Sequence, residues 1–276
     1  MTTDVGPARP LAGPPTRESL EAELRALGVR AGDTLLVHAS MRSTGWVCGG
    51  PTAVVLALRD VLGAGGTLVV PTFTAGNRDP VRWEDPRIPA AWHPAIRAHL
   101  PAFDPAVTPG QRMGAVSEQV RTWPGAVRST HPQVSFAAVG RHAGTVVAGH
   151  DLDCHLGERS PLRRLEDLDA RVLLIGVGWE RCTAFHLAEY RRPDPPLREY
   201  SCAVRLDGRR TWTAFVDVDL DDGDFAAMGA ALEQDPERGG DVARGSLAAA
   251  PARLVPLRTA VAHAGGWLRD HRPHLP

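Results

Sequence analysis

The sequence predicts an α/β fold, a mixed sheet with parallel core strands flanked by helices and an antiparallel hairpin annex. Three observations lead to this expectation. In the first half of the chain, helical patterns alternate with short apolar runs, as they do where helices join parallel strands. The later run RVLLIGVG at 171–178 is apolar enough for a buried strand. After Pro196, the pair Asp207-Gly208 separates two strand-like runs, which is a hairpin signal.

The first expected helix begins after Thr16, a favourable N-cap residue, and ends at Gly28. Within it, leucines recur at the spacing of one helical face: Leu20, Leu24 and Leu27. The apolar runs 34–38 and 67–71 are the first two expected strands. Between them, Pro51 suits the first turn of a helix. The apolar stripe of that helix consists of Val54, Val55, Leu58, Val61 and Leu62.

The segment 74–113 shows little periodicity and contains many prolines, together with Trp83 and Trp92. An irregular segment of this length inside a compact domain is usually functional or disordered. Its tryptophans favour a folded segment. We therefore expect it to pack against the rest of the chain.

Further elements alternate along the rest of the chain. Helices are expected at 114–123, 160–168, 183–190, 224–234 and 258–271, the last weakened by a Gly pair. Strands are expected at 133–140 and 171–178, in the two hairpin runs, and at 246–257. For the domain organisation, we expect residues 1–15 to form a flexible N-terminal tail and residues 16–276 to form a single domain.

Composition excludes several classes of protein. The 276 residues carry a formal net charge of −1, which argues against a nucleic-acid binder or a protein that binds acidic membranes. No apolar run approaches the ~18 residues that a membrane span needs. The four cysteines contain no C-x-x-C pair, which favours reduced thiols and a cytoplasmic location.

The stretch CTAFHLAEY places His186 three residues before Glu189, directly after the expected strand 171–178. On a helix the two side chains would share one face. A carboxylate beside an imidazole fixes its orientation and raises its basicity, which suits a general base near neutral pH. Helices that follow parallel strands also begin at the sheet edge where ligands bind. An ordinary solvated pair is the alternative.

Two loops are candidates for ligand binding. SMRSTGWVCGG at 40–50 offers hydroxyls, a guanidinium and glycine N–H groups before a helix, which suits an anion such as pyrophosphate. It is not a Walker loop, and no G-x-G-x-x-G occurs in the chain. RSTHP at 128–132 offers a cation, two hydroxyls and a histidine restrained by Pro132. Either segment could instead be a turn that binds no ligand.

The segment HDLDCHLGERSP at 150–161 contains Asp151, Asp153, His155 and Glu158. It could be an acidic wall for a cationic ligand, a metal site or a solvated loop. Its spacing matches no known zinc or calcium loop, so we expect no metal. Nucleophile motifs such as G-x-S-x-G are absent, and Cys48 and Cys182 are expected to be inert.

Six motifs, taken in order, resemble those of the aminoglycoside 3-N-acetyltransferase (antibiotic N-acetyltransferase) family, and of its actinomycete branch in particular. They are VHASMRSTGWVCGGP, VVPTFT, RSTHPQVSFAAVG, LGERSPLRRL, RVLLIGVG and CTAFHLAEYR. The resemblance runs from Gly28 to Pro193 and depends on the order of several motifs rather than on any single one.

The resemblance implies an α/β architecture distinct from the common GNAT acetyltransferases. It also implies transfer of the acetyl group of acetyl-CoA to the 3-amino group of the 2-deoxystreptamine ring of an aminoglycoside. By motif match, His186 and Glu189 are the implied catalytic residues, and Glu158 carries over from the GERSP motif. The implied coenzyme A site consists of Ser40, Met41, Arg42, Ser43, Ser129, Thr130 and His131.

For substrate binding we expect Asp79, Asp153 and Glu158, and we expect no metal. Asp79 lies in the irregular segment, whose other acidic residues, Glu84, Asp85 and Asp104, match no family motif. An aminoglycoside carries several ammonium groups, and one must lose a proton before it attacks a thioester. An acidic pocket and a histidine base suit that chemistry, and direct transfer in a ternary complex needs no covalent enzyme intermediate.

Two other functions stay open at this point. The chain could be an acyl-CoA-dependent N-acetyltransferase acting on a non-antibiotic amine, or a non-catalytic protein that binds an antibiotic or coenzyme A. The accepted aminoglycosides are not determined by the sequence. The oligomeric state is open as well, a homodimer included.

Overall fold

The computed structural model describes residues 13–83 and 85–272, and within them a seven-stranded sheet has the order β3-β4-β2-β1-β5-β9-β8. The central strand β1 (Thr34–Ala39) pairs in parallel with β2 (Thr67–Pro71) and β5 (Arg171–Ile175). The remaining strands pair antiparallel: β3 (Val127–Arg128), β4 (Phe136–Gly140), β8 (Ala243–Leu247) and β9 (Ala250–Pro256). The predicted mixed sheet with a parallel core is confirmed.

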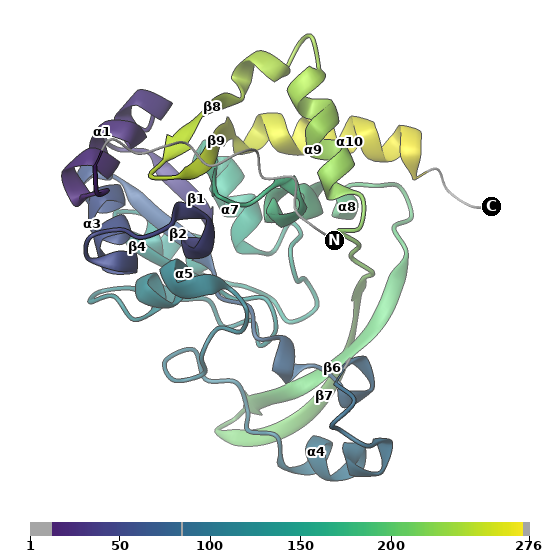
Figure 1. Ribbon diagram of the computed structural model, residues 1–276. Coiled ribbons are helices and arrows are strands. Elements are labelled where there is room, and N and C mark those ends of the chain that lie inside the picture. The colour runs from purple at the N-terminus through teal and green to yellow at the C-terminus, as the bar shows by residue number, and fades with distance from the viewer. Residues whose placement is uncertain (1–12, 84, 273–276) are drawn as a thin grey trace.

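Helices cover both faces of this sheet (Figure 1). One face is covered by α1 (Arg17–Leu27), α3 (Gly50–Leu62) and α5 (Gly114–Arg121). The other is covered by α6 (Ala143–Val147), α7 (Pro161–Asp167), α8 (His186–Tyr190), α9 (Phe225–Gln234) and α10 (Leu257–His271). The result is a three-layer arrangement with two cores.

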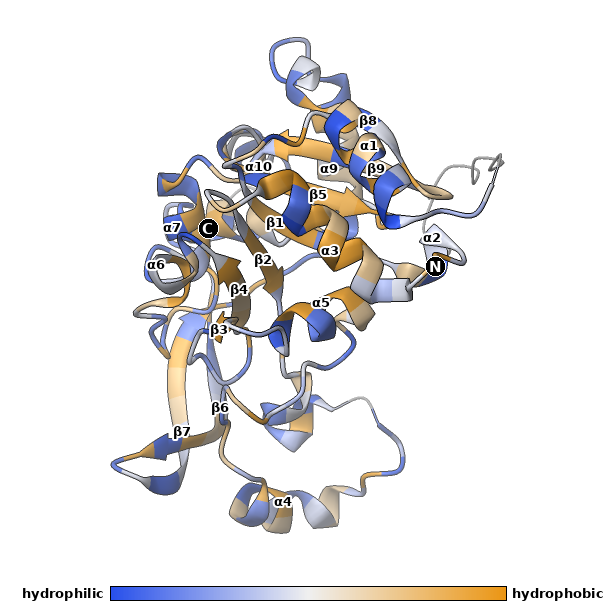
Figure 2. Ribbon diagram, turned by 90° about the vertical axis from the view of Figure 1, so that its left-hand side faces the viewer, coloured by the Kyte–Doolittle hydropathy of each residue, from blue (hydrophilic) through white to orange (hydrophobic). Residues whose placement is uncertain are grey.

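Alternation along the strands divides the two cores. In β1, Leu36 packs into one core while Leu35 and Val37 pack into the other. Successive strand side chains point to opposite faces, so a strand that is covered on both faces must be apolar throughout. Figure 2 shows the hydrophobic colour on the central strands β1, β2 and β5. This burial explains why the strand sequences are continuous apolar runs.

The hairpin of β6 (Leu197–Leu206) and β7 (Arg209–Val218) forms a separate two-stranded sheet that extends away from the main one (Figures 1 and 2). Asp207 and Gly208 turn it with φ of 48° and 75°, as a two-residue hairpin turn requires. The irregular segment packs on this hairpin, with α4 (His93–His99) beside its tip. The N–H of Phe103 donates to Ala203 O at 3.1 Å. The expected packing of 74–113 is thereby confirmed.

Some expected elements differ from the observed ones. The stretch 246–257, expected as one strand, forms parts of β8 and β9, because Ala248 adopts a φ of 52° and reverses the chain. The expected helix 183–190 starts with a 3₁₀ turn at Thr183–Phe185. The Gly pair does not interrupt α10. Short elements such as α2 (Met41–Thr44) were not predicted, because four residues carry no periodic signal.

Most of the expected N-terminal tail lies outside the described residues. Pro15, at its end, is buried, and its carbonyl accepts a hydrogen bond from the N–H of Cys48 at 2.9 Å. The ordered domain therefore includes Pro15. No helix in the described ranges is long and apolar enough to span a membrane.

Candidate active site

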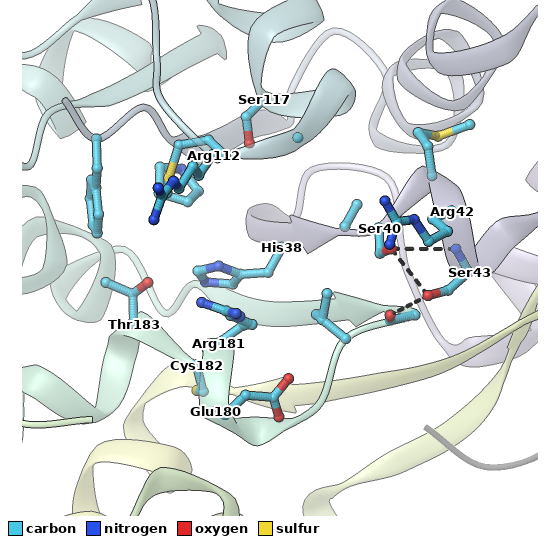
Figure 3. A pocket seen from close by; sticks show the side chains of 18 of the residues that line it. His38, Ser40, Arg42, Ser43, Arg112, Ser117, Glu180, Arg181, Cys182 and Thr183 are labelled. Carbon is cyan, nitrogen blue, oxygen red and sulfur yellow. Dashed lines mark hydrogen bonds between the residues drawn. The ribbon is translucent and has the colours of Figure 1, made fainter. Parts of the chain in front are cut away.

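A cavity of about 700 Å³ opens at the edge of the sheet where the parallel strands end. β1 contributes His38 and Ala39 to its wall, β2 contributes Pro71, and Gly176 follows β5 directly. The carboxyl ends of parallel strands share one edge, and ligands of open α/β sheets bind there. Figure 3 shows the polar side chains that surround this cavity, among them His38, Ser40, Arg42, Arg112, Glu180 and Arg181.

Helix α8 brings His186 and Glu189 together. His186 lines the cavity, and its Nδ1 lies 2.5 Å from Glu189 Oε2. The Glu189 side chain is only 3% exposed, so the alternative of a solvated surface pair does not apply. A carboxylate accepts hydrogen bonds, so Nδ1 carries the proton and Nε2 keeps a lone pair. That arrangement leaves Nε2 available as a base.

The other oxygen of Glu189 is also occupied. Oε1 accepts from the N–H of Asp221 at 3.1 Å and from Nη1 of Arg272 at 2.6 Å. The ring of Phe225 lies 4.7 Å from the imidazole of His186, measured between ring centroids. The carboxylate is therefore fixed by donors from two further segments, and the imidazole packs against a third.

The predicted loop residues Ser40, Met41, Arg42 and Ser43 all line the cavity. Ser40 caps α2 by accepting from the N–H of Ser43 at 3.3 Å. The Ser43 hydroxyl donates to Gly176 O at 2.8 Å and so joins the loop after β1 to the loop after β5. Gly176 has a φ of 62°, and a Cβ there would lie 2.4 Å from Ser43 Cβ. Only glycine permits these two loops to approach so closely.

Charges of both signs line the cavity. Arg42, Arg112 and Arg181 are its guanidinium groups, and Glu180 and Asp222 are its carboxylates. The same cavity could thus contact an anion and a cation at once.

His38, on the same wall, is an uncharged imidazole. Burial, and then the charge of Arg181, lower its pKa to about 3. Within the described residues its Nε2 is buried without a hydrogen-bond partner. An unpaired buried nitrogen costs about 1–3 kcal/mol, so a polar group that reached it would be stabilised.

The second predicted coenzyme loop lies away from the cavity wall. Ser129 and His131 are buried, and the exposed Thr130 between them does not line the cavity either. The Ser129 hydroxyl accepts from the N–H of Phe136 at 2.9 Å. His131 accepts at Nδ1 from the N–H of Gln133 at 3.1 Å. The side chains of Ser129 and His131 therefore have partners inside the protein.

The three acidic residues expected to bind substrate also lie outside the cavity wall. Each is paired with an arginine: Asp79 with Arg97 at 2.8 Å, Asp153 with Arg159 at 2.7 Å, and Glu158 with Arg191 at 2.7 Å. The hydrogen bonds from Arg97 lower the pKa of Asp79 to about 2. Carboxylates already neutralised by arginine have little charge left for a cationic ligand. Glu84 lies outside the described residues.

Sequence reasoning missed several side chains of the cavity wall. The rule that ligands bind at the carboxyl ends of strands could have identified His38 and Glu180, because each lies at or just after such an end. Asp222 and Phe225 come from the segment after the hairpin, which the sequence does not connect to this edge. No group of three or more metal-ligating side chains occurs in residues 13–83 and 85–272.

Known proteins resemble the chain over most of its length. The profile of a family described as aminoglycoside 3-N-acetyltransferase matches residues 36–269. Aminoglycoside N(3)-acetyltransferase VII of Streptomyces paromomycinus is 38% identical, covering 94% of this chain and 93% of its own. The crystal structure of YokD from Bacillus subtilis superimposes with a TM-score of 0.91 at 35% identity, covering 96% and 97%. A structure of AAC-IIIb in a binary complex with CoASH gives 0.82 at 30% identity, covering 96% and 100%.

Proposed function

The chain belongs to the aminoglycoside 3-N-acetyltransferase family, whose members acetylate aminoglycosides, and on this premise we propose direct acetyl transfer from acetyl-CoA to the 3-amino group of the 2-deoxystreptamine ring. His186 is the general base, and both substrates are bound together. One observation carries the proposal. His186 lies on the cavity wall with Nδ1 bonded to buried Glu189, and its Nε2 has no partner among the described residues.

The coenzyme binds, in this proposal, along the loop Ser40–Ser43. Coenzyme A carries phosphate groups, and the guanidinium groups of Arg42, Arg112 and Arg181 lie on the same wall. Guanidinium groups bind phosphate oxygens in bidentate fashion. The related AAC-IIIb structure was solved with CoASH, which supports a coenzyme site in this fold. Ser129, Thr130 and His131 have no part in the proposed contact.

The acceptor is recognised by Glu180 and Asp222, which take the place of Asp79, Asp153 and Glu158. Both carboxylates line the cavity together with His186. A polycationic sugar is attracted to carboxylates whose charge is not already neutralised. Asp222 directly follows Asp221, whose N–H donates to Glu189. One loop therefore contributes a carboxylate to the acceptor wall and also holds the carboxylate that orients the base.

The reaction then needs few protein groups. His186 Nε2 removes a proton from the 3-ammonium group, and the freed nitrogen attacks the thioester carbonyl carbon. The bond from that carbon to sulfur breaks, and the proton held by His186 passes to the departing sulfur. The attacking nitrogen loses its second proton to solvent, so one proton is released per turnover. The products are the N-acetyl sugar and coenzyme A with a free thiol. Holding both substrates in one cavity supplies proximity, at best about 7–11 kcal/mol of the barrier.

One assay separates this proposal from its alternatives. The purified protein is incubated with acetyl-CoA and kanamycin, gentamicin or paromomycin while free thiol is followed, and the acetylated position is assigned by NMR. Thiol release with a 3-N-acetyl product supports the proposal. Release with other amines only would identify a different acceptor. Binding of both ligands without release would identify a sequestering protein.

A further inference from the structure

Arg272, the C-cap residue of α10, is the third member of a hydrogen-bonded chain that runs from the proposed base through Glu189. We propose that Arg272 is a positioning residue, which holds Glu189 ionised and oriented against His186 and fixes the loop that carries Asp222. This inference rests on the proposed function of His186. It adds a residue that lies 86 positions after His186 in the sequence.

The geometry at Glu189 places its charge between two partners. Its Oε2 accepts from His186 Nδ1 at 2.5 Å, and its Oε1 accepts from Arg272 Nη1 at 2.6 Å. The side chain of Glu189 is 3% exposed and that of Arg272 is 15% exposed. A buried carboxylate without a cation is strongly unfavourable. Arg272 is the permanent cation of this group, since the imidazole must be neutral to act as a base.

The remaining donors of Arg272 fix the loop after β7. Its Nε donates to Asp224 Oδ2 at 2.7 Å and its Nη2 also bonds that carboxylate. Nη2 donates further to Asp221 O at 2.7 Å. Asp222 of the cavity wall lies between these two anchor residues. A single planar guanidinium thus joins α10, this loop and α8, a geometry that a lysine ammonium cannot reproduce.

The charge of Arg272 affects the pH dependence of the proposed base, which packing contacts alone would not do. Burial acts to lower the pKa of Arg272, but Asp224 and Glu189 outweigh burial and raise it, so the group stays cationic. Its positive charge offsets part of the negative charge of Glu189. Without it, the pair of His186 and Glu189 binds a proton more readily, whichever of the two holds the proton. The base is then inactivated at a higher pH.

The test is the pH dependence of kcat/KM for Arg272→Met, which keeps the length of the side chain and removes its charge. We expect kcat to fall at least about 10-fold. We also expect the acid limb of the profile of kcat/KM against pH to move up by about one pH unit. Methylguanidinium should restore part of the turnover of Arg272→Ala, because it can refill the space. Arg171→Met is the matched control, since Arg171 pairs with Asp33 at the opposite end of β5.

Several outcomes decide the matter. Wild-type kcat and an unmoved acid limb in Arg272→Met would overturn the inference. If that variant does not fold, Arg272→Lys takes its place. We expect Arg272→Lys to keep the acid limb of the wild type and to have a reduced kcat. An unchanged kcat in Arg272→Lys would overturn the inference.

His186→Ala is assayed in parallel. If His186→Ala is inactive while Arg272→Met behaves as wild type, only the role of Arg272 fails. If His186→Ala is active, the proposed base fails.

Discussion

His186 and Glu189 differ in burial, and the difference fits the separate roles that we propose for them. His186 reaches the cavity, whereas Glu189 lies beneath it with both oxygens bonded. A spacing of three residues on a helix brings such side chains together, so the sequence could predict the pair. It could not predict that Glu189 is buried, because burial depends on Arg272 and the loop at Asp221.

Replacing His186 by alanine removes the proposed base. We expect kcat to fall by about 10²–10⁴, the typical contribution of general base catalysis, while coenzyme A binding and the melting temperature stay close to wild type. Stopped-flow thiol release and calorimetry measure these quantities. His263→Ala is the control, because His263 also pairs with a carboxylate, that of Asp235 at 3.1 Å, outside the cavity. Near-normal turnover of His186→Ala would refute the assignment.

Neutralising the two acidic residues of the cavity should affect one substrate only. We expect Glu180→Gln and Asp222→Asn each to raise KM for the aminoglycoside at least about 10-fold, since a charged hydrogen bond is worth about 1.5–3 kcal/mol. KM for acetyl-CoA should not change. Asp153→Asn serves as the control, because Asp153 pairs with Arg159 away from the cavity. Equal effects on both substrates would contradict the assignment of these carboxylates to the acceptor.

At the scale of elements, the cavity exists because the three parallel strands end at one edge. The loops after β1 and β5 cross there, and the Ser43 hydroxyl bonds Gly176 O at 2.8 Å. Helix α8 begins two short 3₁₀ turns farther on, which brings His186 to the same edge. Strand and helix patterns alone predict this arrangement, because parallel connections always return to the same edge.

The crossing of these loops depends on Gly176. We expect Gly176→Ala to lower both the melting temperature and the affinity for coenzyme A, because the added Cβ would lie 2.4 Å from Ser43 Cβ. Gly208→Ala is a matched control, since Gly208 also has a positive φ, of 75°, but a Cβ added there would meet open space. Both variants share the backbone strain, so the difference between them measures the contact. Equal coenzyme affinity in the two variants would argue against this loop as the coenzyme site.

The second predicted loop shows the limit of reasoning by motif. RSTHP has polar side chains like those of the Ser40 loop, yet Ser129 and His131 bond to neighbouring backbone and are buried. A loop whose polar side chains bond to internal backbone groups can have the same amino-acid composition as a loop that binds a ligand. Only the fold shows which partners are within reach.

At the scale of the whole molecule, a buried histidine, His155, joins the hairpin to the main domain. His155 bonds Asp217 of β7 through Nδ1 at 2.5 Å and Gln133 through Nε2 at 2.8 Å. The Tyr190 hydroxyl donates to the same Asp217 at 2.6 Å, which ties α8 to the hairpin. This network connects three parts of the chain that are distant in sequence.

The neutral state of buried histidines makes stability depend on pH. Burial is the main cause that lowers the pKa of His38 and of His150 to about 3 and that of His131 well below its usual value. The unfolded chain binds protons near pH 6.5 and the folded chain does not. Above that pH the three groups have no effect, and below it stability falls as pH falls toward the folded values.

We expect a loss of about 1.4 kcal/mol for each of these three histidines on going from pH 7.5 to pH 5.5, about 4 kcal/mol together. Urea unfolding at the two pH values measures the change in the free energy of unfolding. NMR of the imidazole protons checks the cause, because these three rings should not titrate above pH 5. A free energy of unfolding that is the same at both pH values would contradict the prediction.

By itself, the sequence determined the mixed α/β fold, the parallel core, the hairpin, the Ser40–Ser43 loop at the sheet edge and the pairing of His186 with Glu189. These follow from local rules, namely periodicity, turn residues and the geometry of parallel connections. The tertiary structure alone decided which charged groups face the cavity. It brought Asp222 to the cavity wall and Arg272 to Glu189, kept Ser129 and His131 inside, and paired Asp79 with Arg97. Contacts between residues far apart in the chain depend on how whole elements pack, and no local pattern in one sequence records that packing.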